Sequence, residues 1–320
     1  MRRVLLGALC AVLLAVPAAA QTFRISVNQF VEHPSLDAVL RGIRDGLQDL
    51  GVLAQFSVHN AQGNMATATQ IAQQIAGEEP DAVVAIATPS AQACAQAIKK
   101  SPVLAKTPLV FTAITDPLAA GLVEDLERPG RNITGVSDKL PVDKHMALLA
   151  EVLPGIHRLG VIFSTGEANS RATAEMLAAE ARGRGWELVQ AGVAKSADVY
   201  QAAKSLVGKV DAIYVPTDNT VVSTLESVIK VGTEARIPVF SADVDSVARG
   251  TVAAVAFDYY LHGKQTARLL RRILVEGVAP GVIPVEHQDQ LVLHINLKAA
   301  KAMGIAIPEP IRLRAEKIYQ

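Results

Sequence analysis

The feature that most constrains the fold is a regular alternation of short apolar runs with longer helical segments, which starts near residue 23. The first series predicts strands at 23–27, 52–58, 81–87 and 108–112, with helices at 35–50, 65–76 and 90–100. The second series predicts helices at 142–152, 168–184, 197–207 and 221–235, with strands at 158–164, 186–193, 211–215 and 238–241. Strands that alternate with helices are typical of parallel βαβ units. We therefore expect an α/β protein with doubly wound sheets.

The two series share a pattern. Residues 81–88 (DAVVAIAT) resemble 211–217 (DAIYVPT), and residues 108–113 resemble 238–242. The first residues of the paired stretches are 27 positions apart in both series. This match predicts two Rossmann-like lobes of the same topology. Because ligands of open α/β sheets bind beyond the carboxyl ends of the strands, two facing lobes would enclose a ligand cleft.

Composition narrows the choice of partners. The chain has 320 residues, half of them hydrophobic, which suits about two domains. It carries 31 basic and 31 acidic side chains and no basic block, so the electrostatic attraction that drives nucleic-acid binding is missing. The sequence therefore argues against a nucleic-acid partner.

Residues 1–20 have the features of a secretory signal peptide: two early arginines, an apolar run and a small-residue end, PAAA. The apolar run is too short to span a bilayer. Cys10 lies inside this run, after a leucine, which argues against a lipid anchor. We predict a soluble periplasmic product in which Cys94 is the one thiol, a small buried hydrophobic residue in a helix.

The sequence lacks the common motifs of enzymes. It has no glycine-rich phosphate-binding motif, no nucleophile elbow and no metalloprotease motif. Its seven histidines are scattered without metal-ligand spacing. We therefore predict a protein with no catalytic residue, no metal and no cofactor.

A family resemblance runs in order along the chain after residue 20. It is carried by the stretches 33–37 (HPSLD), 60–63 (NAQG), 87–91 (ATPSA), 111–117 (FTAITDP), 129–138 (PGRNITGVSD), 167–170 (EANS), 216–219 (PTDN) and 258–260 (DYY). In these stretches the sequence resembles the ABC-transporter substrate-binding proteins that include tryptophan and other aromatic amino acid binding proteins.

The resemblance implies a type I periplasmic-binding fold, in which three crossovers join two lobes. We place the crossovers near 136–141, 254–258 and 284–290. The N-terminal lobe would then comprise 21–137 with 258–285, and the C-terminal lobe 138–257 with 286–320.

The resemblance also implies which residues hold the ligand. The first wall would carry Gln29, His33, Thr88, Pro89, Ser90, Ala91, Thr112, Thr115 and Asp116. The opposite wall would carry Glu167, Asn169, Ser170, Thr217, Asp218, Asn219 and Asp243, with Asp258 and Tyr259 beside the hinge. Many of these residues stand where a helix begins, so helix capping alone is the alternative explanation for them.

An amino acid fits this set of residues. Hydroxyls and helix-start amides near Thr88 and Asn169 would receive its carboxylate. An aspartate would receive its ammonium, Asp218 first and Asp116 or Asp243 next. The sequence leaves open whether Tyr214, Tyr259 or Tyr260 packs against the ligand.

The expected function is solute capture for an ABC importer, in which a small polar ligand, most plausibly an aromatic amino acid, closes the lobes of a monomer. A membrane permease would then recognise the closed form. Two alternatives stay open: a sensor that docks on a membrane signalling receptor, and a secreted enzyme with Asp218, Asp243 and Asp116 as acid and base.

Overall fold

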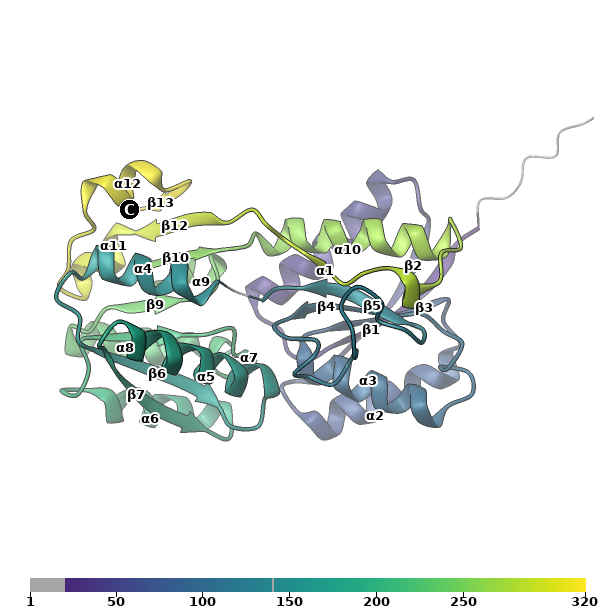
Figure 1. Cartoon of the computed structure of the whole chain (residues 1–320), viewed down its shortest axis with the longest axis horizontal. Helices are drawn as coiled ribbons and strands as arrows, with labels where there is room; N and C mark the ends of the chain where they lie inside the picture. Colours follow the sequence, from purple (N-terminus) through teal and green to yellow (C-terminus); the bar gives the residue numbers. More distant parts are fainter. Residues whose placement is uncertain (1–20, 140) are drawn as a thin grey trace, which may run out of the picture.

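The computed structural model describes residues 21–139 and 141–320, and Figure 1 shows two α/β lobes side by side. The signal peptide predicted at 1–20 lies outside the described residues. Within the described ranges, every helix is too short or too polar to cross a membrane.

The first lobe, as far as it is described, is built on a parallel six-stranded sheet in the order β11-β5-β4-β3-β1-β2. The strands are β1 (Phe23–Gln29), β2 (Ala54–Asn60), β3 (Ala82–Ile86), β4 (Leu109–Ile114), β5 (Ile133–Ser137) and β11 (Glu286–His287). Helices α1 (Pro34–Asp49) and α10 (Tyr259–Leu274) cover one face, and α2 (Met65–Glu78) and α3 (Thr88–Lys100) cover the other (Figure 1). Strands β3, β4 and β5 are buried at every residue, as expected for a sheet covered on both faces.

The second lobe has a parallel sheet in the order β7-β6-β8-β9 and a smaller sheet in the order β10-β12-β13. Its strands are β6 (Arg158–Ser164), β7 (Glu187–Val193), β8 (Ala212–Val215), β9 (Val239–Ser241), β10 (Ala253–Ala256), β12 (Val292–Asn296) and β13 (Lys317–Tyr319). Its helices are α4 (Val142–Val152), α5 (Ala168–Gly183), α6 (Val199–Leu206), α7 (Asn219–Val222), α8 (Leu225–Ala235), α9 (Asp245–Arg249), α11 (Leu297–Ala302) and α12 (Glu309–Arg314). Two short 3-10 turns, η1 (Ser196–Asp198) and η2 (Pro280–Val282), complete the two lobes.

The repeat seen in the sequence corresponds to a repeat in the structure. The order β2-β1-β3-β4 in the first lobe matches β7-β6-β8-β9 in the second. The Asp81 carboxylate accepts a hydrogen bond from the backbone N–H of Arg24 at 2.7 Å. In the second lobe, the Asp211 carboxylate accepts one from the backbone N–H of Arg158 at 2.8 Å. Each repeat thus starts with an aspartate that holds the beginning of the neighbouring central strand, and the predicted fold class is confirmed.

The prediction of one helix at 221–235 is wrong in one respect, because the structure has two helices there, α7 and α8. The break lies at Ser223 and Thr224, whose hydroxyls donate to the carbonyl oxygen of Thr220 at 2.8 and 3.3 Å. Such side-chain bonds to the preceding turn compete with the backbone bonds of a continuous helix. Similarly, the helix predicted at 197–207 is divided into η1 and α6.

The chain passes between the lobes three times: from β5 to α4, from β10 to α10, and from β11 to β12. Strand β11 pairs with β5 in the first sheet, whereas β12 pairs with β10 in the second lobe. Glu286 and His287, which the sequence analysis assigned to the C-terminal lobe, therefore lie in the sheet of the first lobe.

Helix α10 packs unusually close to α1, side by side in Figure 1. A Cβ atom on Gly42 would lie 2.1 Å from the carbonyl oxygen of Tyr260, and one on Gly263 would lie 2.1 Å from that of Val39. Only glycine fits at these two positions. The contact places the beginning of α10 directly after the second crossover, where it faces the space between the lobes.

The buried thiol of Cys94 agrees with its prediction as a small core residue. Its side chain is only 2% exposed and has no disulfide partner within the described residues. Burial raises the pKa of the Cys94 thiol to about 12, so the thiol stays protonated and unreactive in the folded protein.

Candidate functional site

A cavity lies between the two lobes and has walls from both. Its space, counting the opening to solvent, is about 350 Å³. The N-terminal lobe and the first crossover contribute His33, Ser35, Leu36, Ala113, Thr115, Asp138 and Tyr259; the C-terminal lobe contributes Asn169, Thr217, Asp218, Asn219, Val222 and Asp243. Among these described residues there are three aspartates and no lysine or arginine.

Two hydrogen bonds join the walls across the cavity. The Ser35 hydroxyl donates to Oδ1 of Asp243 at 2.9 Å. The hydroxyls of Thr115 and Thr217 lie 3.3 Å apart. The two lobes therefore touch each other at this point.

A wider opening of about 1160 Å³ also lies between the lobes. The first lobe lines it with residues such as Phe30, Asn64 and Pro89, and the second with residues such as Glu167 and Lys195. The space between the lobes thus contains a small cavity and a second, wider opening.

The first wall depends on a bulge in β4. Ala113 has a φ of +55°, a left-handed conformation that is uncommon for alanine, and the β4–β5 register shifts between Thr112 and Ile114. The N–H of Ala113 donates to Nε2 of His262 at 3.1 Å. Burial lowers the pKa of His262 to about 4, so its ring is neutral and can accept this bond at neutral pH. A strained backbone next to a cavity, with a buried side chain holding it, is typical of functional sites.

Side chains on one face of α10 form hydrogen bonds with residues of this wall and of the strands behind it. The Tyr259 hydroxyl donates to Oδ2 of Asp138 at 2.6 Å, and the Thr266 hydroxyl lies 2.9 Å from that of Thr112. With His262 between them, these residues are three and four positions apart and so share one side of the helix. Asp258 caps the helix by accepting from the N–H groups of Tyr260 and Leu261. Helix α10 therefore positions the ends of both β4 and β5.

In the second wall, the buried carboxylates of Asp218 and Glu167 accept hydrogen bonds from the short helix α7. Asp218 accepts from the N–H of Val221 at 2.8 Å and also from the N–H of Ser164. Glu167 accepts from the N–H and hydroxyl of Thr220 at 2.9 and 2.7 Å, and from the Asn219 amide at 2.5 Å. Burial, and next the charge of Glu167, raise the pKa of Asp218 to about 7. These carboxylates hold α7 in place with their own hydrogen bonds.

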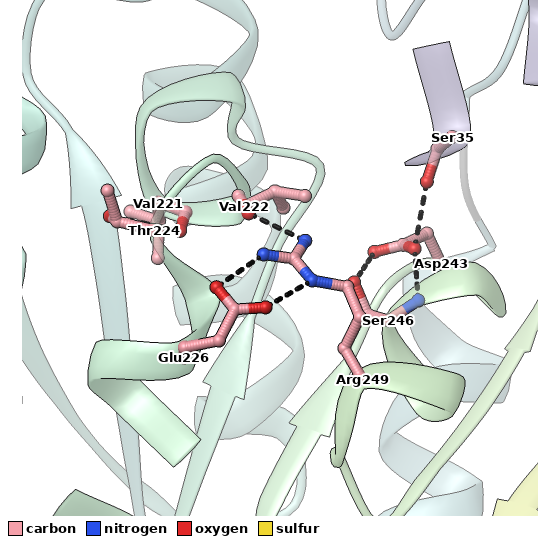
Figure 2. Close-up of polar contacts among 8 residues, drawn as sticks. All are labelled: Ser35, Val221, Val222, Thr224, Glu226, Asp243, Ser246 and Arg249. Carbon is pink, nitrogen blue, oxygen red and sulfur yellow. Dashed lines mark hydrogen bonds and ion pairs between the residues drawn. The ribbon is translucent and has the colours of Figure 1, made fainter. Parts of the chain in front are cut away.

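Asp243 lies two residues after the end of β9, and its carboxylate is also engaged in hydrogen bonds, as Figure 2 shows. Its Oδ1 accepts from the N–H of Ser246 at 2.8 Å as well as from Ser35, and its Oδ2 accepts from the Ser246 hydroxyl at 2.6 Å. In the same view, Arg249 donates to both oxygens of Glu226 and to the carbonyl of Val222, each at 2.8 Å. This arrangement anchors Val222, the apolar part of the second wall.

The buried ring of His33 stands opposite Asp243. Burial lowers the pKa of His33 to about 4, although the nearby charge of Asp243 acts in the other direction. The ring is therefore neutral at neutral pH. Its Nδ1 has no hydrogen-bond partner among the described residues, and the residue lines the cavity.

The predicted site residues divide into three groups. Those that line the cavity are His33, Thr115, Asn169, Thr217, Asp218, Asn219, Asp243 and Tyr259. Pro89 and Glu167 line the wider opening. The other eight predicted residues line neither the cavity nor the wider opening: Gln29, Thr88, Ser90, Ala91, Thr112, Asp116, Ser170 and Asp258.

Most of the residues in this third group are occupied elsewhere. Gln29 donates to Asp37 at 2.8 Å, Ser90 donates to Asn28 at 2.9 Å, and Asp116 pairs with Lys139 at 3.1 Å. Asp116 also accepts from the N–H of Ala119 at 2.9 Å, as a turn cap does. The alternative of helix or turn capping thus describes Asp116 and Asp258, and it describes Asp218 too, although that residue was the first choice for the ammonium.

The sequence analysis missed five lining residues: Ser35, Leu36, Ala113, Asp138 and Val222. A signal existed for Asp138, which follows a buried strand at a predicted crossover. Ser35 and Leu36 belong to the HPSLD stretch. Ala113 lies in the FTAITDP stretch, but the sequence does not indicate that it lines a cavity, because this depends on the bulge in β4.

The structure shows where each of the three tyrosines considered from the sequence lies. Tyr259 lines the cavity. Tyr214 is 1% exposed inside the second lobe, and its hydroxyl pairs with His145. The Tyr260 hydroxyl instead donates to Asp45 on α1 at 3.0 Å.

Known proteins resemble this chain over nearly its whole length. A tyrosine-binding protein of Clostridioides difficile (strain R20291) is 39% identical over 285 residues, which are 88% of this chain and 81% of the relative. The structure of an ABC domain in complex with L-Trp from Streptococcus pneumonia is 32% identical, covers 93% of this chain and 100% of its own, and superposes with a TM-score of 0.87. A ligand-free, open substrate binding protein with adhesive properties from Clostridium difficile is 35% identical and covers 93% and 99%, but its TM-score is 0.69.

The family profile described as ABC transporter substrate binding protein matches residues 24–319. Its members and the relatives above are binding proteins rather than enzymes, which confirms the prediction of a non-enzyme and removes the acid-base alternative. The chain therefore belongs to the ABC transporter substrate-binding protein family, as its sequence motifs predicted.

Proposed function

We propose that this chain is the periplasmic solute-binding component of an ABC importer and that it captures an amino acid, with aromatic amino acids favoured, between its lobes. The observation that carries the proposal is the cavity with walls from both lobes. A ligand that contacts both walls binds the closed arrangement better than the open one and so shifts the population toward closure.

The comparisons support lobe closure as the mechanism. At similar sequence identity, the chain superposes better on the L-Trp complex than on the open, ligand-free relative. The bonds Ser35–Asp243 and Thr115–Thr217 would break if the lobes separated. The closed arrangement is the form that we propose the permease recognises, with the binding protein acting as a monomer.

The choice of an amino acid rests on the relatives and on the lining. One relative is named for tyrosine and another was crystallised with L-Trp. The cavity of this chain offers apolar side chains, Leu36 and Val222, beside polar groups and the ring of Tyr259. An aromatic amino acid has both an apolar part and a charged part to match such a lining.

The test is a thermal-shift and calorimetric screen of the twenty amino acids on the purified protein. Binding to the folded state alone raises the melting temperature once the ligand concentration passes the Kd. A selective shift with tyrosine, tryptophan or phenylalanine supports the proposal. If a non-aromatic amino acid raises the melting temperature instead, the solute-binding function stands and the ligand is a different amino acid. If none of the twenty raises it, amino acid capture is contradicted.

A further inference from the structure

The cavity contains one carboxylate that the protein does not fully use. Asp218 accepts two backbone N–H groups, and Asp243 accepts three hydrogen bonds from Ser35 and Ser246. Asp138 differs: its Oδ2 accepts from Tyr259, but its Oδ1 has no hydrogen-bond partner among the described residues. The side chain is only 3% exposed. A buried charged oxygen without a partner is costly, so its presence needs an explanation.

Building on the proposed function of this cavity, we propose that Asp138 receives the positively charged ammonium group of the bound solute. The aspartates chosen from the sequence, Asp218 first and Asp116 or Asp243 next, all accept capping bonds from backbone N–H groups. No lysine or arginine lines the described cavity, and the His33 ring is neutral, so the protein itself supplies no cation for Asp138. An ammonium on the ligand would supply the missing partner.

Tyr259 acts as a positioning residue in this arrangement. Its hydroxyl holds Oδ2 of Asp138 at 2.6 Å from the first turn of α10. The close glycine contact holds α10 against α1, so the backbone of Tyr259 is held in place as well. The carboxylate is therefore held in one orientation, with Oδ1 as its unpaired atom.

A second acceptor comes from the opposite lobe. The Asn169 amide donates through Nδ2 to the carbonyl of Thr217 at 2.9 Å, which identifies its other atom as the oxygen. That oxygen, Oδ1, is unpartnered in a side chain that is 5% exposed and lines the same cavity. An ammonium has three N–H donors, so it can bond Asp138 and Asn169 together. Such a bridge between lobes is a direct way for a cationic solute to favour closure.

The test is calorimetry with L-tyrosine and L-tryptophan and with their deaminated counterparts, 3-(4-hydroxyphenyl)propionate and indole-3-propionate. Asp138→Asn keeps the shape of the side chain and an acceptor for Tyr259 but removes the charge. Asp116→Asn is the matched control, because its carboxylate lies outside the cavity and pairs with Lys139. Melting curves show whether each variant is folded.

We expect Asp138→Asn to weaken binding of the amino acid by roughly 100-fold. The same change should leave binding of the deaminated compound within about twofold, because the group that Asp138 contacts is absent. The control variant should alter neither. In the wild-type protein, the deaminated compound should bind about as weakly as the amino acid binds to Asp138→Asn.

Two results would overturn this assignment. If Asp138→Asn folds and binds the amino acid as tightly as the wild type, or loses affinity for both kinds of compound equally, Asp138 does not receive the ammonium, while the proposed function stands. If the wild-type protein binds none of the amino acids, the proposed function fails and the assignment fails with it.

Discussion

The hydroxyl of Ser35 and the carboxylate of Asp243 are 208 positions apart in the chain and form a 2.9 Å hydrogen bond across the space between the lobes. Ser35 lies in the first turn of α1, and Asp243 follows the end of β9. Both side chains are almost fully buried, at 2% and 3% exposure. The bond links the first helix of one lobe to the last parallel strand of the other, and it exists only while the lobes are together.

Ser35→Ala should therefore weaken ligand binding without unfolding the protein. A hydrogen bond to a charged group contributes about 1.5–3 kcal/mol, and here it contributes to the closed arrangement alone. We expect the Kd to rise by roughly tenfold, measured by calorimetry. Ser205→Ala is the control, because that hydroxyl bonds the Ala202 carbonyl on the exposed α6. Equal affinities of the two variants would show that the bond does not favour closure.

Tyr259→Phe should lower stability as well as affinity. The change removes the hydroxyl that donates to Asp138 and leaves a buried carboxylate with fewer partners. We expect the free energy of unfolding to fall by about 1–3 kcal/mol in urea titrations. The neighbouring Tyr260→Phe removes a hydroxyl bonded to the exposed side of α1, and it should change stability by less than about 0.5 kcal/mol. A reversed order of the two effects would contradict the role given to Tyr259.

The charge of Asp138 should have opposite effects on binding and on stability. Burial raises the pKa of Asp138 from 3.8 to about 6, while the hydrogen bond from the Tyr259 hydroxyl acts in the other direction. A raised folded-state pKa means that the stabilising contribution is present below pH 4 and is lost as the pH rises through 6. Asp138→Asn should therefore be more stable than the wild type by up to ~3 kcal/mol at pH 8, and the difference should vanish near pH 4.

Asp116 provides a control of opposite sign for this pH profile. Although burial acts to raise it, the pKa of Asp116 is lowered by hydrogen bonds, first that of the Ala119 N–H, and by Lys139. Its carboxylate thus stabilises the fold above its ordinary pKa and stops doing so as the pH falls. Asp116→Asn should be less stable than the wild type at pH 7, with a difference that shrinks in acid. Melting curves recorded from about pH 2 to 8 cover both transitions, because that of Asp116 lies below its ordinary pKa of 3.8. A parallel pH dependence of the two variants would contradict these opposite signs.

The glycine contact between α1 and α10 gives a prediction about packing. Gly263→Ala would place a Cβ 2.1 Å from a backbone carbonyl, so the two helices would have to separate. We expect a loss of at least about 1–3 kcal/mol in unfolding free energy, together with weaker ligand binding, because α10 carries Tyr259 and His262. In α2, Gly77→Ala meets no atom within 4 Å and should stabilise by about 0.5–1 kcal/mol. A harmless Gly263→Ala would mean that the helices are not held in close contact.

The fold was predictable because its signal is local and repeated. Buried strands such as β3 and β8 are continuous apolar runs that begin after an aspartate, and two of the predicted segments, α4 and β6, have the same bounds in the structure. The break between α7 and α8 was not predictable, because it depends on two hydroxyls that compete with backbone hydrogen bonds.

The site was predictable in outline and not in its roles. Residues at the ends of strands do reach the space between the lobes, as Thr217 and Asp243 do. Sequence patterns do not reveal which carboxylate has an unused oxygen. Asp218 and Asp138 both follow buried strands, and only their three-dimensional neighbours, the N–H groups of α7 for one and a single tyrosine hydroxyl for the other, distinguish them.

Because the chain crosses between the lobes, the first lobe cannot be completed before part of the second has been synthesised. Residues of α10 are made after the whole four-stranded sheet of the second lobe, yet they cover one face of the first sheet and the glycine-lined side of α1. Since synthesis proceeds from the N-terminus, the first lobe is begun first and completed late, when the final crossover strands have emerged. Until then α1 covers this face of the sheet without its partner helix. The first lobe of a growing chain thus cannot complete its packing before α10 has been made.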